Sequence, residues 1–305
     1  MFKRVLKIGL FLTAGLGLAF VWYYPDQNLR VIMCDVGQGD SILITRGFSQ
    51  VVIDGGPNET VLSCLGKHMP FWDRQIEMVV MTHPQADHMT GLVEVLKRYR
   101  VGVMVADGVR GEGKLYDALV SVLIQNHIQM LVPKTGDRID VGGMGWEVWW
   151  PGDRVGGRDA WEKIFMGGGD SLPLVVDGLK IDDLNQVSVV MELVYGDFKA
   201  VFTGDLGERE ELALTSRGVT EGVVLLKVPH HGSKYSSSAP FLEVVKPRLA
   251  VISVGKKNSF GHPSSDTLMR LDAVGAKVLR TDELGDVVVV TDGRGYWLEG
   301  TAVGN

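Results

Sequence analysis

The stretch "VVMTHPQADHMTGL", residues 79–92, gives the clearest indication of the fold. It begins as an apolar run typical of a buried strand, and His83, Asp87 and His88 follow directly. Imidazoles and carboxylates at the end of a strand are well placed to bind metal ions, because a rigid scaffold holds them there. The stretch therefore predicts one part of a metal site, in which Gln85 occupies the place of a further imidazole.

Strand and helix patterns alternate along most of the chain. Residues 90–99, for example, form an amphipathic helical pattern between two apolar runs. Residues 185–205 predict a hairpin that turns at Gly196 and Asp197, whereas the Gly- and Asp-rich residues 152–184 predict a loop or an insertion. This pattern predicts an α/β fold with two sheets and outer helices, formed as one continuous domain by residues 26–305.

The composition limits the function classes. The chain has 305 residues, 45% hydrophobic and 22% charged, with a net charge of −6. A globular domain fits these values, and a strongly basic nucleic-acid binder does not, so contact with nucleic acid would need a local patch. Cys34 and Cys64 form no CxxC pair, which argues against a thiolate zinc site. We expect two buried free thiols, with a disulfide in an oxidising compartment as the alternative.

Residues 1–25 predict a membrane anchor. Lys3, Arg4 and Lys7 precede an uncharged apolar run from Ile8 to Tyr24, which is long enough to cross a bilayer. Basic residues on the N-terminal side favour a cytoplasmic N-terminus. The main domain would then be extracytoplasmic and membrane-anchored, or secreted if this segment is instead a cleaved signal peptide.

Metal-binding side chains follow four predicted strands: His83, Asp87 and His88 after the first, Asp205 after the second, His230 and His231 after the third, and His262 after the fourth. Each of them alone is more readily explained as a cap, a turn or a surface residue. Independent explanations do not predict that five of the seven histidines should gather in three such loops. The pattern therefore indicates a shared metal site.

The same segments resemble a known family. "THPQADHMTGL", "FTGD" and "HHGS" resemble the signature of the metallo-β-lactamase fold. "DVGQGDSILI", "IDGG", "VPHHGSKYSSS" and "GHPSSDTL" resemble, in the family's order, the metallo-hydrolase domain at the C-terminus of ComEC competence proteins. The resemblance implies an αββα sandwich with its site at one edge of the sheets. The family's membrane channel has many apolar segments, whereas this chain has one.

The resemblance implies a set of metal ligands: His83, Asp87, His88, the bridging carboxylate Asp205, and His230, with His231 as the alternative to His230. Gln85 departs from the motif, and a further histidine is missing near Asn185 and Gln186. His127, at a predicted helix end, does not replace it. Because fewer imidazoles disfavour zinc, we expect one or two divalent ions, with Mn²⁺ favoured and Zn²⁺ as the alternative.

The implied reaction is hydrolysis of a phosphodiester. Four residues beside the site are expected to bind phosphate oxygens: Ser233, Lys234, Ser236 and Asn258. Asp87 would accept the proton of the attacking water, and His262 would stabilise the developing charge or protonate the leaving oxygen. The resemblance implies DNA as the substrate, cleaved outside the membrane beside a DNA-uptake machinery. The alternatives are a lactonase or esterase on the same scaffold, and a non-catalytic DNA-binding module.

Overall fold

The computed structural model describes residues 24–151, 175–176, 179–180, 183–218 and 222–300. The predicted anchor, apart from its last two residues, lies outside this part of the chain, as does most of the predicted loop at 152–184. Among the helices that are described, none has the length and apolar character needed to cross a bilayer.

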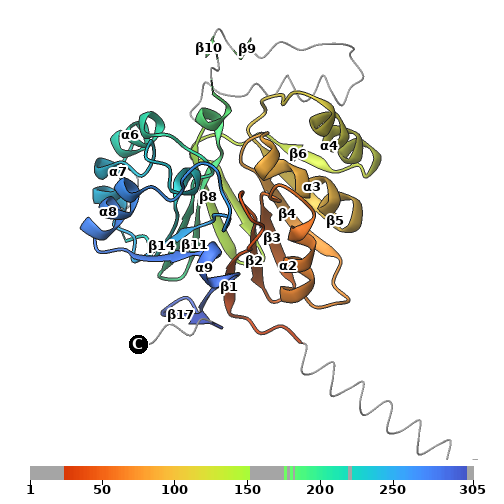
Figure 1. The fold of residues 1–305 in the computed structure, drawn as a ribbon. Coiled ribbons are helices and arrows are strands. Elements are labelled where there is room, and N and C mark those ends of the chain that lie inside the picture. Colours follow the sequence, from red (N-terminus) through yellow and green to blue (C-terminus); the bar gives the residue numbers. More distant parts are fainter. Residues whose placement is uncertain (1–23, 152–174, 177–178, 181–182, 219–221, 301–305) are drawn as a thin grey trace, which may run out of the picture.

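An eight-stranded sheet is built by the N-terminal half together with the last two strands (Figure 1). In spatial order its strands are β17 (Tyr296–Glu299), β16 (Val287–Thr291), β1 (Leu29–Met33), β2 (Ile42–Arg46), β3 (Ser49–Ile53), β4 (Gln75–Met81), β5 (Arg100–Ala106) and β6 (Gln129–Leu131). Pairing is antiparallel from β17 to β3 and parallel from β3 to β6. Parallel neighbours need crossover connections, which are α2 (Thr60–His68), α3 (Ala86–Arg98) and α4 (Lys114–Gln125).

A seven-stranded sheet is built by strands between residues 138 and 280. In spatial order its strands are β15 (Lys277–Arg280), β14 (Leu249–Ile252), β13 (Leu225–Lys227), β12 (Phe198–Phe202), β11 (Val190–Tyr195), β8 (Met144–Trp150) and β7 (Arg138–Val141). The crossover helices are α6 (Glu208–Ser216), α7 (Ala239–Val245) and α8 (Ser265–Ala273). The short elements are β9 (Val175–Val176), β10 (Leu179–Lys180), α9 (Thr281–Leu284) and two 3₁₀ turns, η1 (Leu184–Val187) and η2 (Pro229–Gly232). The predicted hairpin at Gly196 and Asp197 is confirmed as β11 and β12.

The two sheets face each other across the central core. Alternate residues of β1 point to opposite sides: Leu29, Val31 and Met33 enter the core between the sheets, whereas Ile32 packs towards the helices. From the second sheet, Trp146 and Phe202 pack into the central core. Strands buried on both faces in this way require a helical layer on each outer side.

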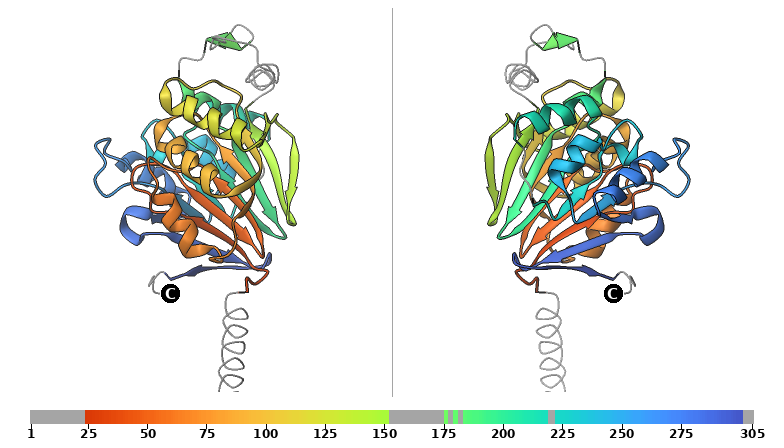
Figure 2. Two further views of the ribbon diagram at one scale, coloured as in Figure 1. Left: turned by 90° about the vertical axis from the view of Figure 1, so that its right-hand side faces the viewer. Right: turned by 90° about the vertical axis from the view of Figure 1, so that its left-hand side faces the viewer.

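Two outer cores lie under the helices (Figure 2). The helices α2, α3 and α4 bury apolar side chains on the first sheet, and α6, α7 and α8 bury theirs on the second: Leu65, Leu92 and Leu119, and Leu214, Phe241 and Leu271. The order of layers is therefore helix, sheet, sheet, helix. The predicted αββα sandwich is confirmed.

A disulfide joins Cys34, just after β1, to Cys64 in α2. The expectation of two buried free thiols is therefore wrong. Both side chains belong to the outer core of the first sheet, where α2 packs over the end of β1 and brings the two Cα atoms to 5.9 Å. The two cysteines are 30 positions apart in the sequence, and no local pattern signalled this proximity.

Candidate metal centre

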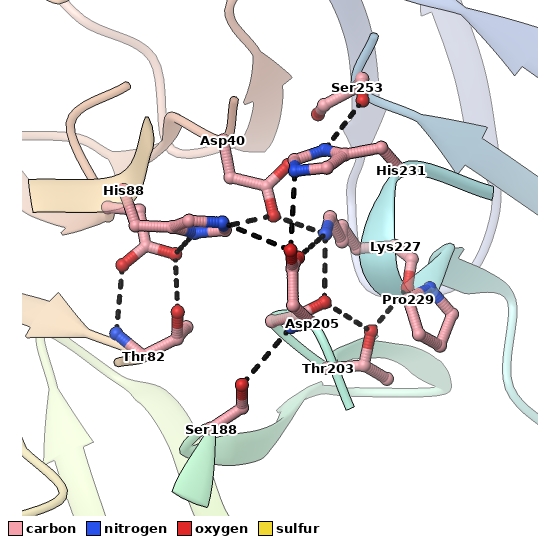
Figure 3. A network of polar contacts seen from close by, with 12 residues as sticks. Asp40, Thr82, His88, Ser188, Thr203, Asp205, Lys227, Pro229, His231 and Ser253 are labelled. Carbon is pink, nitrogen blue, oxygen red and sulfur yellow. Dashed lines mark hydrogen bonds and ion pairs between the residues drawn. The ribbon is translucent and has the colours of Figure 1, made fainter. Parts of the chain in front are cut away.

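Segments at strand ends in both sheets bring polar side chains together (Figure 3). The polar side chains that they bring together are Asp40 after β1, Asp54 after β3, His83 after β4, Asp87 and His88 in the first turn of α3, Asp205 after β12, Lys227 at the end of β13, and His231 in η2. Apart from Asp87, which is partly exposed, all of these residues are buried. Each half of the chain therefore supplies part of one interior polar cluster.

Four of these residues form a tight group. The ligand atoms of Asp87, His88, Asp205 and His231 all lie within 4.8 Å of one another. Oδ2 of Asp205 is 3.4 Å from Nε2 of both His88 and His231. Oδ2 of Asp87 lies 3.5 Å from Nε2 of His231 and 3.9 Å from Nε2 of His88. Two imidazoles and two carboxylates thus converge on one point.

The inner atoms of this group lack hydrogen-bond partners. Nε2 of His88, Nε2 of His231 and Oδ1 of Asp205 are buried and form no hydrogen bond in the structure. Buried polar atoms without partners are costly in a folded protein unless something else satisfies them. A divalent cation bound by the two imidazole nitrogens and by carboxylate oxygens would satisfy both nitrogens, and these ligand types fit such an ion chemically.

The ring of His88 is held from behind. Its Nδ1 lies 2.8 Å from Oδ2 of Asp54, and Asp54 in turn accepts hydrogen bonds from the backbone N–H and the hydroxyl of Thr82. A carboxylate that accepts the Nδ1 proton fixes the tautomer in which Nε2 carries a free lone pair. Asp54 therefore prepares His88 to bind a metal ion.

His231 is held in a comparable way. Its Nδ1 lies 2.9 Å from the backbone carbonyl of Ser253 and 3.4 Å from Oδ1 of Asp40. An Nδ1 proton donated to this carbonyl leaves the Nε2 lone pair directed at Asp205. The second sheet, through β14, therefore orients the second imidazole.

The charges in the group are mutually dependent. Burial acts to raise the pKa of Asp205, but His231 and His88 beside it hold that pKa well below the usual range. Burial acts to lower the pKa values of both histidines, but Asp205 raises them well above the usual range. Without a metal ion the two imidazoles therefore carry protons that offset Asp205, and a bound cation would replace those protons.

His83 is adjacent to the four-residue group but is not part of it. Its ring centroid lies 4.2 Å from that of His88, and its Nδ1 is 3.0 Å from the Thr82 hydroxyl. Burial is the main cause that lowers the pKa of His83 to about 3, so its ring is neutral. Its Nε2 has no hydrogen-bond partner.

Gln85 contacts Asn185, a residue near the position of the other missing histidine. The side-chain amide of Gln85 donates to Oδ1 of Asn185 at 3.0 Å, and Gln85 precedes the first residue of α3. Two polar residues found near the positions where the family has histidines are therefore hydrogen-bonded to each other. His127 follows α4 and is exposed, and it does not join the site, as expected from its exclusion from the predicted ligand set.

The structure brings His231, rather than His230, into the group. Both residues adopt left-handed backbone angles, with φ of 50° and 52°, so the chain turns sharply between them. The half-buried ring of His230 instead lies 5.9 Å from the ring of His262. His230, the preferred candidate ligand, therefore lies outside the group, and His231, the alternative, lies within it.

Three of the four expected phosphate-binding side chains shape the loops. Ser236 donates to the carbonyls of Pro229 and Ser233. Ser233 is buried and accepts a hydrogen bond from the backbone of Tyr235. Asn258 donates to the carbonyls of Gly255 and His262 and accepts from the His262 N–H.

Lys234 is the exposed member of that set, and its ammonium lies 4.9 Å from the centroid of the Tyr235 ring. His262 is half-buried and stacks with Phe260 at 5.8 Å and 12° between the ring planes. Burial is the main cause that lowers the pKa of His262. Tyr235 and Phe260 are 67% and 68% exposed, so two aromatic faces meet solvent on the loops that carry His231 and His262.

Sequence reasoning missed three residues of the cluster: Asp40, Asp54 and Lys227. Asp40 follows "GQG", whose glycines are typical of a tight turn, and Asp54 follows an apolar strand where an ordinary turn residue would also stand. Lys227 lies within an apolar strand. A lysine in a strand that is otherwise buried was the available signal, because such a residue needs a buried partner.

Comparison with known proteins agrees with this fold. Residues 34–256 match the sequence model of the family described as "Metallo-beta-lactamase superfamily". The metallo-beta-lactamase fold protein YhfI from Bacillus subtilis superposes with a TM-score of 0.52 and 10% sequence identity, over 86% of this chain and all of that one. At such low identity the superposition supports the fold alone.

Two curated relatives are competence proteins. ComE operon protein 3 of Bacillus subtilis is 26% identical over 88% of this chain and 34% of the relative. Competence protein ComA of Neisseria gonorrhoeae is 28% identical over 90% of this chain and 36% of the relative. The chain thus spans about a third of the length of these relatives.

Proposed function

The chain belongs to the metallo-beta-lactamase superfamily, and from this premise we propose that it is a metal-dependent phosphodiesterase that cleaves DNA outside the membrane. The observation that carries the proposal is the convergence of Asp87, His88, Asp205 and His231 with unpartnered nitrogens turned inward. A divalent ion held there supplies Lewis acidity and lowers the pKa of water.

Asp87 is the proposed base. Its carboxylate is 33% exposed, whereas the carboxylate of Asp205 is almost completely buried. It therefore reaches both the cluster and the solvent side, where a substrate would lie. Burial acts to raise the pKa of Asp87, but His231 and His88 beside it lower that pKa overall, so Asp87 is ionised and able to accept a proton.

His262 is proposed to contact the phosphate. Because its pKa is lowered, the ring is neutral at pH 7 and offers an N–H to a phosphoryl oxygen rather than a full charge. Its neighbour Phe260 and the exposed Tyr235 offer faces on which unpaired bases can stack. This arrangement favours single-stranded DNA as the substrate.

A local basic patch supports binding to nucleic acid. Lys234, Lys256 and Lys257 are exposed on the loops that carry the two aromatic faces. They provide the positive charge that a chain with a net charge of −6 needs near its site. The competence-protein relatives support the same substrate and a place beside a DNA-uptake machinery.

The proposed location is extracytoplasmic, either anchored by residues 1–25 or secreted. The disulfide between Cys34 and Cys64 supports this proposal, because disulfides persist in oxidising compartments. The basic residues before the apolar N-terminal run point in the same direction.

The proposed ion is Mn²⁺, with Zn²⁺ as the alternative. The group has two carboxylates and two imidazoles, and Gln85 supplies no third imidazole. Mn²⁺ accepts such mixed nitrogen and oxygen coordination with added water, whereas zinc hydrolases commonly use nitrogen-rich sites.

The test uses the full chain, purified in detergent and stripped of metal. Labelled single-stranded and duplex DNA are incubated with Mn²⁺, Zn²⁺ or Mg²⁺, and the products are separated by size. We expect cleavage of single-stranded DNA that is fastest with Mn²⁺. Asp205→Asn, which changes no volume, should abolish cleavage, because ligand changes cost about 10–100-fold or more in metal affinity or activity.

The alternatives are tested in the same assay. A lactone and a p-nitrophenyl ester replace DNA as substrates, and hydrolysis of these without cleavage of DNA would favour a lactonase or esterase. Binding of DNA without any hydrolysis, unchanged in Asp205→Asn, would favour a non-catalytic DNA-binding module. Either result would overturn the proposed phosphodiesterase.

A further inference from the structure

Lys227 places a buried positive charge inside the metal centre (Figure 3). Its side chain is fully buried, and its ammonium forms an ion pair with Oδ2 of Asp40 and donates to the carbonyl of Gly204 at 2.9 Å. A buried ammonium is costly unless it is paired and hydrogen-bonded, and these two contacts meet that need. The charge is therefore built into the site.

The two oxygens of Asp205 have different partners. Oδ2 faces the imidazoles of His88 and His231, at 3.4 Å from each. Oδ1 has no hydrogen-bond partner, and its charged neighbour is the ammonium of Lys227 at 3.6 Å. A carboxylate that bridges two metal ions offers one oxygen to each, but here an ammonium lies beside the second oxygen.

We propose that Lys227 takes the place of a second divalent ion at Asp205, so that the site binds one metal ion per chain. This inference rests on the proposed metal-dependent function and deepens it. The single ion would be held by the four-residue group, in which Asp205 contributes Oδ2. A protonated amine has no lone pair, so Lys227 neutralises Oδ1 without serving as a ligand.

The remaining side chains around His83 support this assignment. The ligand atom of His83 is outside the four-residue group, and the side-chain N–H of Gln85 donates to Asn185. A second ion would therefore find one imidazole, at most a neutral amide oxygen, and an aspartate oxygen that already faces a positive charge. Repulsion from Lys227 would weaken its binding further, since charges act strongly on one another where water is excluded.

The test counts metal ions directly. The metal-free full chain is titrated with Mn²⁺, and the electron paramagnetic resonance signal of free Mn²⁺ gives the number of ions bound. We expect one equivalent in the wild type, with the spectrum of an isolated ion. Two equivalents with the spectrum of a spin-coupled pair would overturn the proposal, and this result needs no variant.

Two substitutions test the role of the lysine itself. Lys227→Ala removes the ammonium and frees Asp40 and Oδ1 of Asp205, so we expect binding to rise from one equivalent towards two. Lys227→Arg keeps the charge and should remain at one. A folded Lys227→Ala protein that still binds one ion would overturn the proposal, and circular dichroism checks the fold of each variant.

Assays of DNA cleavage on the same samples separate this proposal from the proposed function. One bound ion without cleavage would overturn the DNA substrate and support the lysine assignment. Two bound ions together with cleavage would overturn the lysine assignment and support the DNA substrate. A wild-type protein that binds no Mn²⁺ and no Zn²⁺ would overturn both.

Discussion

His230 and His231 are adjacent in the chain, but their side chains have different surroundings. His231 is buried, and its Nε2 faces Asp205, whereas the half-buried ring of His230 lies beside that of His262. Burial is the main cause that lowers the pKa of His230, so its ring is neutral in the loop. The pair therefore offers a matched test of the proposed ligand set.

We expect His231→Ala to abolish Mn²⁺ binding and His230→Ala to retain it. The first change removes one of the four convergent ligand atoms, which should cost about 10–100-fold or more in affinity. The second leaves all four in place. Metal content after gel filtration and calorimetric titration measure both. Equal loss of metal in the two variants would contradict this, because metal binding would then depend on the left-handed turn rather than on the His231 imidazole.

Individual residues also show how far the sequence predicts the site. His83, Asp87, His88 and Asp205 were expected to lie together because each follows a strand, and the structure brings them together. The choice between His230 and His231 depended on two backbone angles that residue types do not determine. The roles of the buried partners Asp40, Asp54 and Lys227 depend on packing between distant segments, which no local pattern encodes.

Helix α3 is the element that sets the geometry of the site. It begins at Ala86, four residues before the amphipathic pattern predicted, because the polar motif itself forms the first turn. Its backbone packs directly on the loop after β3: the Gly55 N–H donates to the His88 carbonyl, and the Gly91 N–H to the Gly56 carbonyl. A side chain at Gly91 would clash with the carbonyls of Gly55 and Asn58.

We expect Gly91→Ala to destabilise the chain by about 1–3 kcal/mol, as overpacking of backbone against backbone does. It should also weaken metal binding, because the displaced helix carries His88 and the displaced loop adjoins Asp54. Gly66→Ala, in α2, is the control: its Cβ would meet open space, and alanine should stabilise that helix by about 0.5–1 kcal/mol. Urea unfolding measures both changes, and a stable Gly91→Ala would contradict the packing argument.

The link between β1 and α2 offers a second test at this scale. A disulfide that closes a loop of this length should contribute about 3–4 kcal/mol to the free energy of unfolding. We expect the double change Cys34→Ser and Cys64→Ser to lower stability by that amount. A reductant should destabilise the wild type similarly and leave the double variant unchanged. No effect of reductant on the wild type would argue against a formed disulfide.

At the scale of the whole molecule, the proposed site joins the two halves of the sandwich. Asp87 and His88 come from the first sheet's half, and Asp205 and His231 from the second. The layers were predictable because strand and helix patterns alternate. The return of β16 and β17 to pair beside β1 was not, because that pairing joins residues about 260 positions apart and leaves no local trace.

Protons and metal ions compete for the imidazole nitrogens of His88 and His231. The pKa values of these two histidines therefore determine whether stability rises or falls with pH. In the metal-free chain the pKa values of His88 and His231 are raised, so their protonated forms stabilise the fold below the ordinary pKa of about 6.5. That contribution is lost as the pH rises through the raised values. The pKa of Asp205 is lowered, so its ionised form stabilises the fold at pH values above the ordinary pKa of 3.8. This stabilisation is lost only as the pH falls through the lowered pKa, in acid.

We therefore expect the melting temperature of the metal-free chain to fall as the pH rises above 7. Mn²⁺ should oppose this fall, because it binds the deprotonated imidazoles. At 100 times its Kd it adds about 2.7 kcal/mol, or ~5 °C, and the gap between the two melting curves should widen with pH. Scanning calorimetry from pH 6 to about 9, with His231→Ala as control, measures the gap. A gap independent of pH in the wild type would mean that these histidines do not exchange protons for metal.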